Sequence, residues 1–296
     1  MQSAPRSPGS WPLAPGSPTC TVSPRAAKAL SAPLTCKHLV TISKRRFTHQ
    51  QQATRHCTAI PADRFHWFGR RLRAWYRLNA RDLPWRRTRD PYRILVSELM
   101  LQQTQVSRVV DYYHRFLERF PTLVHVAESP LDGVLEQWSG LGYYARARNL
   151  HKLAHRLTDG GTVEGTMPSD TEGLRALPGI GAYTAGAVST FAYEKRAPLV
   201  DTNVARVLLR FFAPRFAARA AIKGALSQRL AWTLAERSLP ARAGKSSWEH
   251  NQALMELGAL VCTARVARCA VCPLSRECAS AFDERVLGDA APARSE

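Results

Sequence analysis

Residues 177–186 read Leu177-Pro178-Gly179-Ile180-Gly181-Ala182-Tyr183-Thr184-Ala185-Gly186, and this stretch decides the fold. It predicts a helix that ends near Leu177, a tight turn at the two glycines, and a second helix that begins at once. Gly179 and Gly181 are expected to permit positive φ and a close approach of the backbone. The amides that open the second helix would then face outward as an anion site. Two interpretations fit these residues: an ordinary corner between helices, and a helix-hairpin-helix, which holds a DNA phosphate without reading sequence.

The rest of the chain from Phe65 onward also favours helices. Val109, Tyr113 and Phe116 recur at helix spacing, and prolines punctuate the segments without any useful length of strand-like alternation. We therefore expect an all-α body.

The composition indicates a polyanionic partner. The chain has 42 Lys+Arg against 23 Asp+Glu, a formal charge of +19, and a pI of about 10.4. Residues 1–62 contain no Asp or Glu, and residues 63–296 are still clearly basic without them. No apolar run is long enough to span a bilayer.

Residues 1–62 are predicted to be a disordered basic extension, because Pro, Ser, Ala, Arg and Lys dominate them. A transit peptide and a start codon assigned too far upstream are the alternatives. Cys20, Cys36 and Cys57 lack metal-site spacing and are expected to be free thiols. Residues 281–296 are expected to be a disordered tail.

Four cysteines near the C-terminus form the pattern C-x6-C-x2-C-x5-C: Cys262, Cys269, Cys272 and Cys278. Thiols at this density in one basic stretch predict a metal centre. Their chemistry alone fits a zinc site and an iron–sulfur cluster about equally, and disulfides are the weaker alternative because nothing else indicates secretion.

Together with the hairpin and the cysteines, several further stretches make residues 63–280 resemble the catalytic portion of MutY-type adenine DNA glycosylases, in the endonuclease III superfamily. These stretches are Leu83-Pro84-Trp85-Arg86, Ser97-Glu98-Leu99-Met100-Leu101-Gln102-Gln103-Thr104-Gln105, Gly140-Leu141-Gly142-Tyr143-Tyr144-Ala145-Arg146-Ala147-Arg148-Asn149, Val200-Asp201-Thr202-Asn203-Val204 and Asn251-Gln252-Ala253-Leu254-Met255-Glu256-Leu257-Gly258.

The resemblance implies two helical domains that flank a DNA-binding cleft. A six-helix domain over 88–200 would contain the hairpin at about 170–190, and 63–87 with 201–280 would form a discontinuous iron–sulfur domain. The four cysteines would hold a 4Fe–4S cluster with a structural role, in a loop whose Arg265 and Arg268 face a DNA phosphate.

The activity that the resemblance implies is hydrolytic removal of adenine from double-stranded DNA with A·8-oxoguanine or A·G mispairs, in base excision repair. We expect a monomer without membrane association. Its compartment would be the cytoplasm or nucleoid of a bacterium, or the nucleus or mitochondrion of a eukaryote.

Two carboxylates are the candidate catalytic pair. Glu98 lies in an apolar helix, where burial would raise its pKa toward that of a general acid, although a surface glutamate is the commoner case. The resemblance assigns Glu98 protonation of adenine N7. Asp201 is a natural helix N-cap, and the resemblance adds stabilisation of positive charge on the deoxyribose. Asn203 and Tyr183 would complete the pocket.

Tyr183 predicts the reaction type. The matching residue is a lysine in the strand-cleaving endonuclease III branch, where it forms a Schiff base. A tyrosine here predicts attack by water; a core tyrosine is the alternative.

Extrusion of a base requires residues that fill the gap in the duplex. The resemblance assigns intercalation to Gln103 and Tyr143. Leu141 and Arg146, on the same loop as Tyr143, are expected to contact DNA, and Arg81, Trp85 and Arg86 are expected to line the adenine pocket.

The sequence departs from the family pattern in two places. It ends 18 residues after Cys278, without room for the usual C-terminal domain that helps recognise 8-oxoguanine, so we expect a narrower preference for that lesion. Asp201-Thr202-Asn203 replaces the usual Asp-Gly-Asn. The competing hypotheses are a T·G mismatch thymine glycosylase of the same fold, which Glu98 argues against, and a non-catalytic lesion-binding protein.

Overall fold

The computed structural model describes residues 51, 53–158, 166–217, 223–283 and 286, all of which belong to the compact unit Arg46–Glu296. Over these residues the chain is helical, with one isolated β-bridge between Cys262 and Ala267 and no strand. The predicted all-α fold is therefore confirmed. No helix in the described part of the chain is long and apolar enough to cross a membrane.

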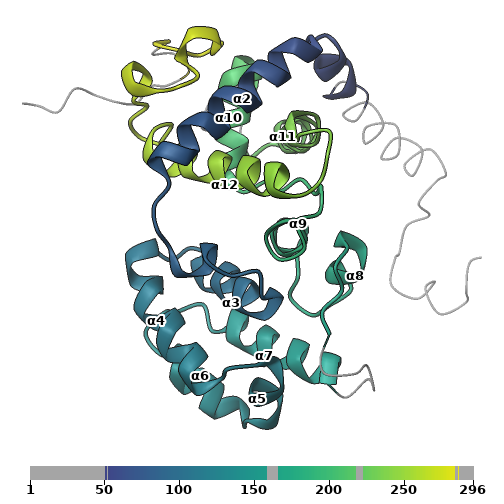
Figure 1. Cartoon of the computed structure of the whole chain (residues 1–296), viewed down its shortest axis with the longest axis vertical. Helices are drawn as coiled ribbons and strands as arrows, with labels where there is room; N and C mark the ends of the chain where they lie inside the picture. Colours follow the sequence, from purple (N-terminus) through teal and green to yellow (C-terminus); the bar gives the residue numbers. More distant parts are fainter. Residues whose placement is uncertain (1–50, 52, 159–165, 218–222, 284–285, 287–296) are drawn as a thin grey trace, which may run out of the picture. The chain divides into compact units, whose positions relative to one another are not determined.

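The α-helices are labelled in Figure 1. They are α2 (Ala62–Asn79), α3 (Pro91–Leu101), α4 (Val106–Arg119), α5 (Leu123–Glu128), α6 (Leu131–Trp138), α7 (Ala145–Thr158), α8 (Thr171–Arg175), α9 (Ala182–Phe191), α10 (Thr202–Phe212), α11 (Ala225–Ser238) and α12 (Lys245–Leu260). Short 3-10 helices cover Pro84–Arg86, Pro214–Phe216, Cys269–Val271 and Ser275–Glu277.

Helices far apart in the sequence pack together. α2 lies against α11 and α12, and α10 packs on both α11 and α12 (Figure 1). α3 contacts α4, α7 and α9, while α5 and α6 pack on α7 and α8 packs on α9. α9 also contacts α12, which connects the two groups of helices. The division into domains over 88–200 and over 63–87 with 201–280 stays a prediction.

Local sequence signals explain where key helices begin. Asp90 caps α3 by accepting hydrogen bonds from the Tyr92 amide at 2.8 Å and the Arg93 amide at 3.3 Å, and Pro91 occupies the first helical position. The apolar stripe of α4 is buried as predicted, at Val109 and Tyr113 among others. The cap fixes the start of α3 and therefore the position of Glu98 along the helix.

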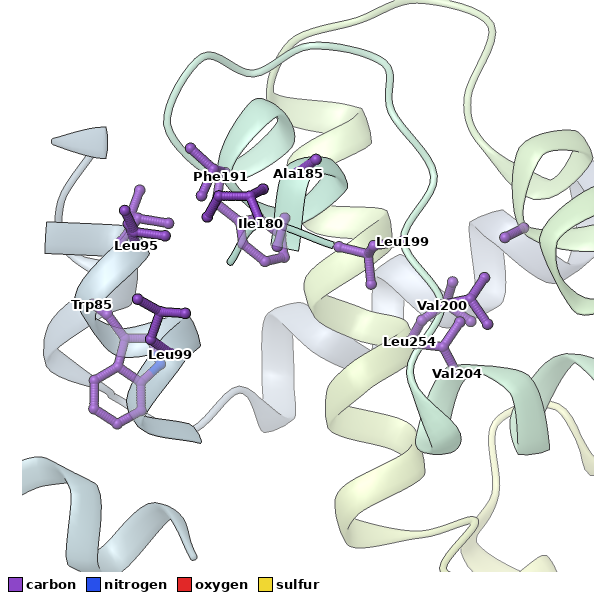
Figure 2. Close-up of a cluster of buried hydrophobic side chains, with 14 of the residues drawn as sticks. Trp85, Leu95, Leu99, Ile180, Ala185, Phe191, Leu199, Val200, Val204 and Leu254 are labelled. Carbon is purple, nitrogen blue, oxygen red and sulfur yellow. The ribbon is translucent and has the colours of Figure 1, made fainter. Parts of the chain in front are cut away.

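The hydrophobic core runs from α3 through α9 to α10 and α12. Figure 2 shows side chains of this core, including Leu95 and Leu99 from α3, Ile180, Ala185 and Phe191 around α9, and Leu199, Val200, Val204 and Leu254. Gly186 on α9 permits the chain to pass closely, because a methyl group there would overlap the Pro198 carbonyl oxygen. This contact fixes the segment that leads into Asp201.

The predicted boundary of the disordered extension, at residue 62, lies too far along the chain. Residues 53–58 are helical, and Ala53, Cys57 and Ile60 are buried. The Arg237 guanidinium donates to the carbonyl oxygens of Cys57 and Ile60. The prediction of disorder is therefore wrong over 53–62. The basic, proline-flanked sequence gave no sign that Ala53, Cys57 and Ile60 would be buried. Residues 1–50 and nearly all of the predicted C-terminal tail lie outside the described residues, and Cys57 is the one of the three expected free thiols that the structure describes.

Candidate active site

A cavity of about 760 Å³ gathers all four predicted catalytic residues and four of the nine predicted DNA-binding residues. Its wall comes from the segment before α3, the end of α3, the start of α9, the start of α10 and the middle of α12. The predicted residues in this wall are Arg81, Trp85, Arg86, Glu98, Gln103, Tyr183, Asp201 and Asn203. The fold thus joins residues that are distant in the sequence into one site.

Glu98 is buried at the cavity, with 3% of its surface exposed, so the alternative of a surface glutamate is wrong. Its Oε2 atom has no hydrogen-bond partner in the described part of the chain. Burial raises the pKa of Glu98 to about 7; the Tyr183 hydroxyl opposes this rise and the charge of Asp201 adds to it. Near neutral pH, Glu98 therefore holds a proton in part of the molecules, as a general acid must.

Asp201 caps α10 and also lines the cavity. Its Oδ1 accepts the Val204 amide at 2.7 Å and its Oδ2 accepts the Asn203 side-chain amide at 3.0 Å. Burial raises the pKa of Asp201, while these two hydrogen bonds act in the opposite direction. Gly258 on α12 permits this arrangement, because a Cβ there would lie 2.9 Å from the Asn203 Cβ.

Tyr183 faces the same cavity from the first turn of α9. Its hydroxyl lies 3.9 Å from the Met255 sulfur. Burial and the charge of Glu98 raise the pKa of Tyr183 well above its ordinary value, so the phenol stays protonated. The residues that line the cavity include no lysine, so the described wall offers no amine nucleophile.

A buried ion network beneath the cavity was not predicted from the sequence. Glu256 accepts hydrogen bonds from Arg81 at 2.8 and 2.9 Å and from Arg86 at 2.8 Å, and Arg86 also donates to Gln252 at 2.9 Å. Burial by itself would raise the pKa of Glu256, but the two arginines outweigh it and lower the pKa to about 2. Its signal in the sequence was a glutamate that directly follows Ala253-Leu254-Met255 and precedes Leu257.

The cavity therefore contains two carboxyl groups whose pKa values are shifted in opposite directions. Glu98 has a raised pKa and Glu256 has a lowered pKa, which separates a proton donor from a permanent anion in one site. Arg81 and Arg86 line the cavity as predicted, and they also serve as internal partners of Glu256.

Arginines of α10 connect the active site with the cysteine segment. The Arg206 guanidinium donates to Asn203 Oδ1 and to the carbonyl oxygens of Gly258 and Cys262, each at 2.8 Å. One turn later, Arg210 donates to the Cys262 sulfur at 3.5 Å. The segment that carries the cysteines is therefore anchored to the helix that Asp201 begins.

The four predicted metal ligands, Cys262, Cys269, Cys272 and Cys278, line one pocket and form no disulfide. Burial raises the pKa of Cys272 to about 12 and that of Cys278 to about 11, and the neighbouring thiols add to both shifts. Among the described residues, no three Cys, His, Asp or Glu side chains are grouped closely enough to hold a single metal ion. Four thiols around one pocket have the donor type that holds an iron–sulfur cluster, and Arg210 and Arg268 in the same wall would offset part of the thiolate charge.

Two predicted intercalating residues have unusual backbones. Gln103 has φ of 57° and Tyr143 has φ of 49°, in the left-handed region that non-glycine residues rarely adopt. The Tyr143 side chain is 58% exposed. Such strain costs about 1–3 kcal/mol per residue and persists where the surrounding structure requires the conformation.

The hairpin has the predicted helix–turn–helix order, with α8 before the turn and α9 after it. Gly179 has φ of 76° and lies against the side chain of Asn149. Gly181 has φ of −86° and caps α9, so of the two glycines that permit positive φ, Gly179 adopts it and Gly181 does not. No side chain caps α9, and its first amides therefore stay available for an anion.

Leu141 and Arg146 have internal positions, which corrects their predicted contact with DNA. Leu141 is buried, and the guanidinium of Arg146 donates to the carbonyl oxygens of Leu99, Met100 and Gln102 at 2.7–2.8 Å. Arg146 also donates to the Gly142 carbonyl oxygen at 2.8 Å. It joins the end of α3 to the loop of Tyr143, because α3 leaves carbonyl groups unpaired there.

The chain is similar to proteins of known function. Residues 96–233 match the HhH-GPD superfamily of base excision DNA repair proteins. The chain is 45% identical over 205 residues to the adenine DNA glycosylase of Mycobacterium tuberculosis, which is 69% of this chain and 64% of the relative. It is 37% identical over 214 residues to that of Buchnera aphidicola, 72% of this chain and 58% of the relative. The chain is thus similar to HhH-GPD base excision DNA repair proteins over residues 96–233, a little under half of its length.

The superfamily match covers Glu98, Asp201 and the hairpin, and it stops before Glu256 and the cysteines. The human adenine DNA glycosylase is 42% identical over 217 residues, which is 70% of this chain and 38% of the relative. The chain therefore spans between about two fifths and two thirds of the length of these relatives.

Solved structures show the same fold. A thermostable thymine-DNA glycosylase aligns with a TM-score of 0.65 and 28% identity, over 74% of this chain and 96% of that one. An endonuclease III in a trapped covalent complex with DNA aligns with a TM-score of 0.61 and 24% identity, over 75% of this chain and 97% of that one.

Proposed function

We propose that this protein is a member of the HhH-GPD superfamily and a monofunctional DNA glycosylase that hydrolyses the N-glycosidic bond of adenine mispaired with 8-oxoguanine or guanine. The observation that carries the proposal is the cavity in which Glu98, with a pKa of about 7, shares one wall with Asp201 and Tyr183. The similarity to adenine DNA glycosylases of 37–45% identity supports adenine as the base.

The proposed reaction has two steps. The bond between C1′ and N9 breaks, its electron pair stays with adenine, and the Glu98 carboxyl gives its proton to N7, so that neutral adenine leaves. Asp201 stabilises the positive charge that develops on the sugar. Water then adds to C1′, and its proton passes to the Glu98 carboxylate, which restores the enzyme. No amine is needed, in agreement with Tyr183 at the position of the lysine.

Double-stranded DNA is the proposed partner, held by phosphate contacts. The uncapped amides of α9 and the exposed Arg265 and Arg268 provide cationic or donor groups. Gln103 and Tyr143 have loop positions and backbone conformations that suit insertion into the duplex. We propose that activity extends to both A·8-oxoguanine and A·G.

A single-turnover assay tests the activity. Duplexes with A·8-oxoguanine, A·G, A·C and T·G are incubated with excess protein, and the released base is identified by mass spectrometry. Adenine release from the first two supports the proposal. Thymine release from T·G would favour the related mismatch thymine glycosylase, and binding without any release would favour a lesion-binding protein.

We also propose that Cys262, Cys269, Cys272 and Cys278 hold a 4Fe–4S cluster. When bound, this group supplies a structural cross-link through four thiolates. Iron and sulfide analysis of anaerobically purified protein should give about four equivalents of each with broad visible absorbance. Cys269→Ser should lose this absorbance and solubility. A colourless protein with one zinc would contradict the proposal.

A further inference from the structure

A second cavity, of about 270 Å³, lies where α2 meets the end of α11. It shares no lining residue with the cavity of Glu98 and Asp201. The charged part of its wall consists of Arg70, Arg73 and Arg237, with His66 beside them, and no Asp or Glu lines it. Three arginines thus line one small cavity in the described part of the chain, and its wall contains no acidic residue.

Arg73 is half-buried on α2, and its guanidinium has no hydrogen bond or ion pair with any described residue. Burial lowers the pKa of Arg73, and the charge of Glu249 only partly offsets this effect. Glu249 is itself engaged with Arg77, whose guanidinium donates to it at 2.7 Å. A cation partly removed from water without a bound counter-ion is unfavourable, and an anion in the cavity would relieve it.

The other two arginines differ in their contacts and exposure. Arg237 is fixed, because it donates to the carbonyl oxygens of Cys57 and Ile60 and lies over the Phe65 ring at 4.6 Å. Arg70 is exposed and has no hydrogen bond or ion pair with a described residue. The wall of the cavity therefore combines one arginine held by hydrogen bonds with one exposed arginine.

Gly69 keeps space open beside Arg73. A Cβ at Gly69 would lie 3.0 Å from Arg73 Nη1 and 3.7 Å from His250 Nδ1. His250 is fully buried, and its Nδ1 atom has no partner among the described residues, while its Nε2 atom lies 3.0 Å from the Ser238 hydroxyl. A second polar atom without a partner thus lies near Gly69, on the same side as the Arg73 guanidinium.

We propose that this cavity binds a phosphate group, held by Arg73 and Arg237 and covered by Arg70. Guanidinium groups pair with phosphate oxygens through parallel, charge-assisted hydrogen bonds, and several cations without an acid favour a dianion. The volume is just below that of typical small-ligand sites, about 300–1,000 Å³, which suits inorganic phosphate or the phosphate end of a nucleotide. The site goes beyond the glycosylase function and does not depend on it.

The test is thermal unfolding of the full chain without DNA, in phosphate-free buffer at constant ionic strength. Inorganic phosphate, AMP and a chloride control are titrated separately. The unfolding temperature of the wild type should rise with phosphate or AMP in a saturable way. Arg73→Gln should raise the concentration needed for the same shift by about 10-fold or more, because it removes a charge-assisted hydrogen bond. Arg71→Gln, which removes the same charge from an exposed site of α2 outside the wall, should retain the wild-type response.

Gly69→Ala separates binding from structure. Alanine favours a helix over glycine, so this variant should unfold at an equal or higher temperature without phosphate. Its methyl group displaces the Arg73 guanidinium, so the phosphate-dependent shift should shrink several-fold. Greater stabilisation by AMP than by phosphate would identify a phosphomonoester as ligand, and the reverse would identify free phosphate. A full response in both Arg73→Gln and Gly69→Ala, or equal loss in Arg71→Gln, would overturn the site.

Discussion

Substitution of Glu98 by glutamine should abolish catalysis and stabilise the fold at the same time. The folded-state pKa of Glu98 is about 7 against an ordinary value of 4.5, because burial disfavours the charged form. Below pH 4.5 the carboxyl is protonated in both states and burial adds no ionisation cost. As the pH rises, the unfolded chain releases its proton first. The free energy of unfolding therefore falls between these two values, and the loss is complete above the folded-state pKa.

The size of this loss follows from the pKa difference. A shift from 4.5 to about 7 corresponds to about 3 kcal/mol at pH 8 and to less than about 1 kcal/mol at pH 5. Glutamine has nearly the same shape and does not ionise. Relative to wild type, Glu98→Gln should therefore gain about 3 kcal/mol at pH 8 and almost nothing near pH 5.

Urea unfolding at both pH values, followed by circular dichroism, measures this difference. Glu118→Gln on α4 is the matched control, because Glu118 is exposed, and it should show no pH-dependent difference from wild type. In parallel, the single-turnover rate of wild type should fall roughly tenfold per pH unit above about pH 7, and Glu98→Gln should lose at least about 100-fold. A stability difference that is the same at pH 5 and pH 8, or wild-type rates in Glu98→Gln, would refute the reasoning.

Three further predictions concern the same site and its support. Borohydride should trap no covalent adduct between wild-type protein and substrate DNA, because Tyr183 offers no amine; a trapped species on a denaturing gel would contradict this. Gly258→Ala should lower the single-turnover rate and the stability, by about 1–3 kcal/mol, because its methyl group overlaps Asn203, whereas Gly133→Ala on α6, with open space around it, should be neutral or slightly stabilising. Arg146→Gln should destabilise the protein by about 3 kcal/mol in urea unfolding, since several buried carbonyl groups lose their donor; a change in DNA affinity with unaltered stability would instead restore the predicted DNA contact.

Some features of this protein were already fixed by local sequence. The glycines and the leucine of residues 177–186 predict a turn between two helices, because only glycine adopts positive φ without cost, as Gly179 does. The apolar stripe of α4 predicts which face is buried, as Val109 and Tyr113 show. A glutamate among apolar residues made a buried carboxyl a candidate at Glu98, and the packing decided between burial and the commoner surface position.

Only the tertiary structure determined those properties of a residue that depend on neighbours distant in the sequence. The sequence offered Arg146 as a DNA contact, but the end of α3 and the following loop present carbonyl groups that its guanidinium pairs with. Glu256 gave no hint of its two arginine partners, which come from a segment about 170 positions earlier. The charge state, burial and hydrogen bonds of a side chain depend on all the residues that surround it in the folded protein. The sequence therefore identified the residue types of the site, and only the packing of α3, α9, α10 and α12 determined which of them are acids, which are supports and which are exposed.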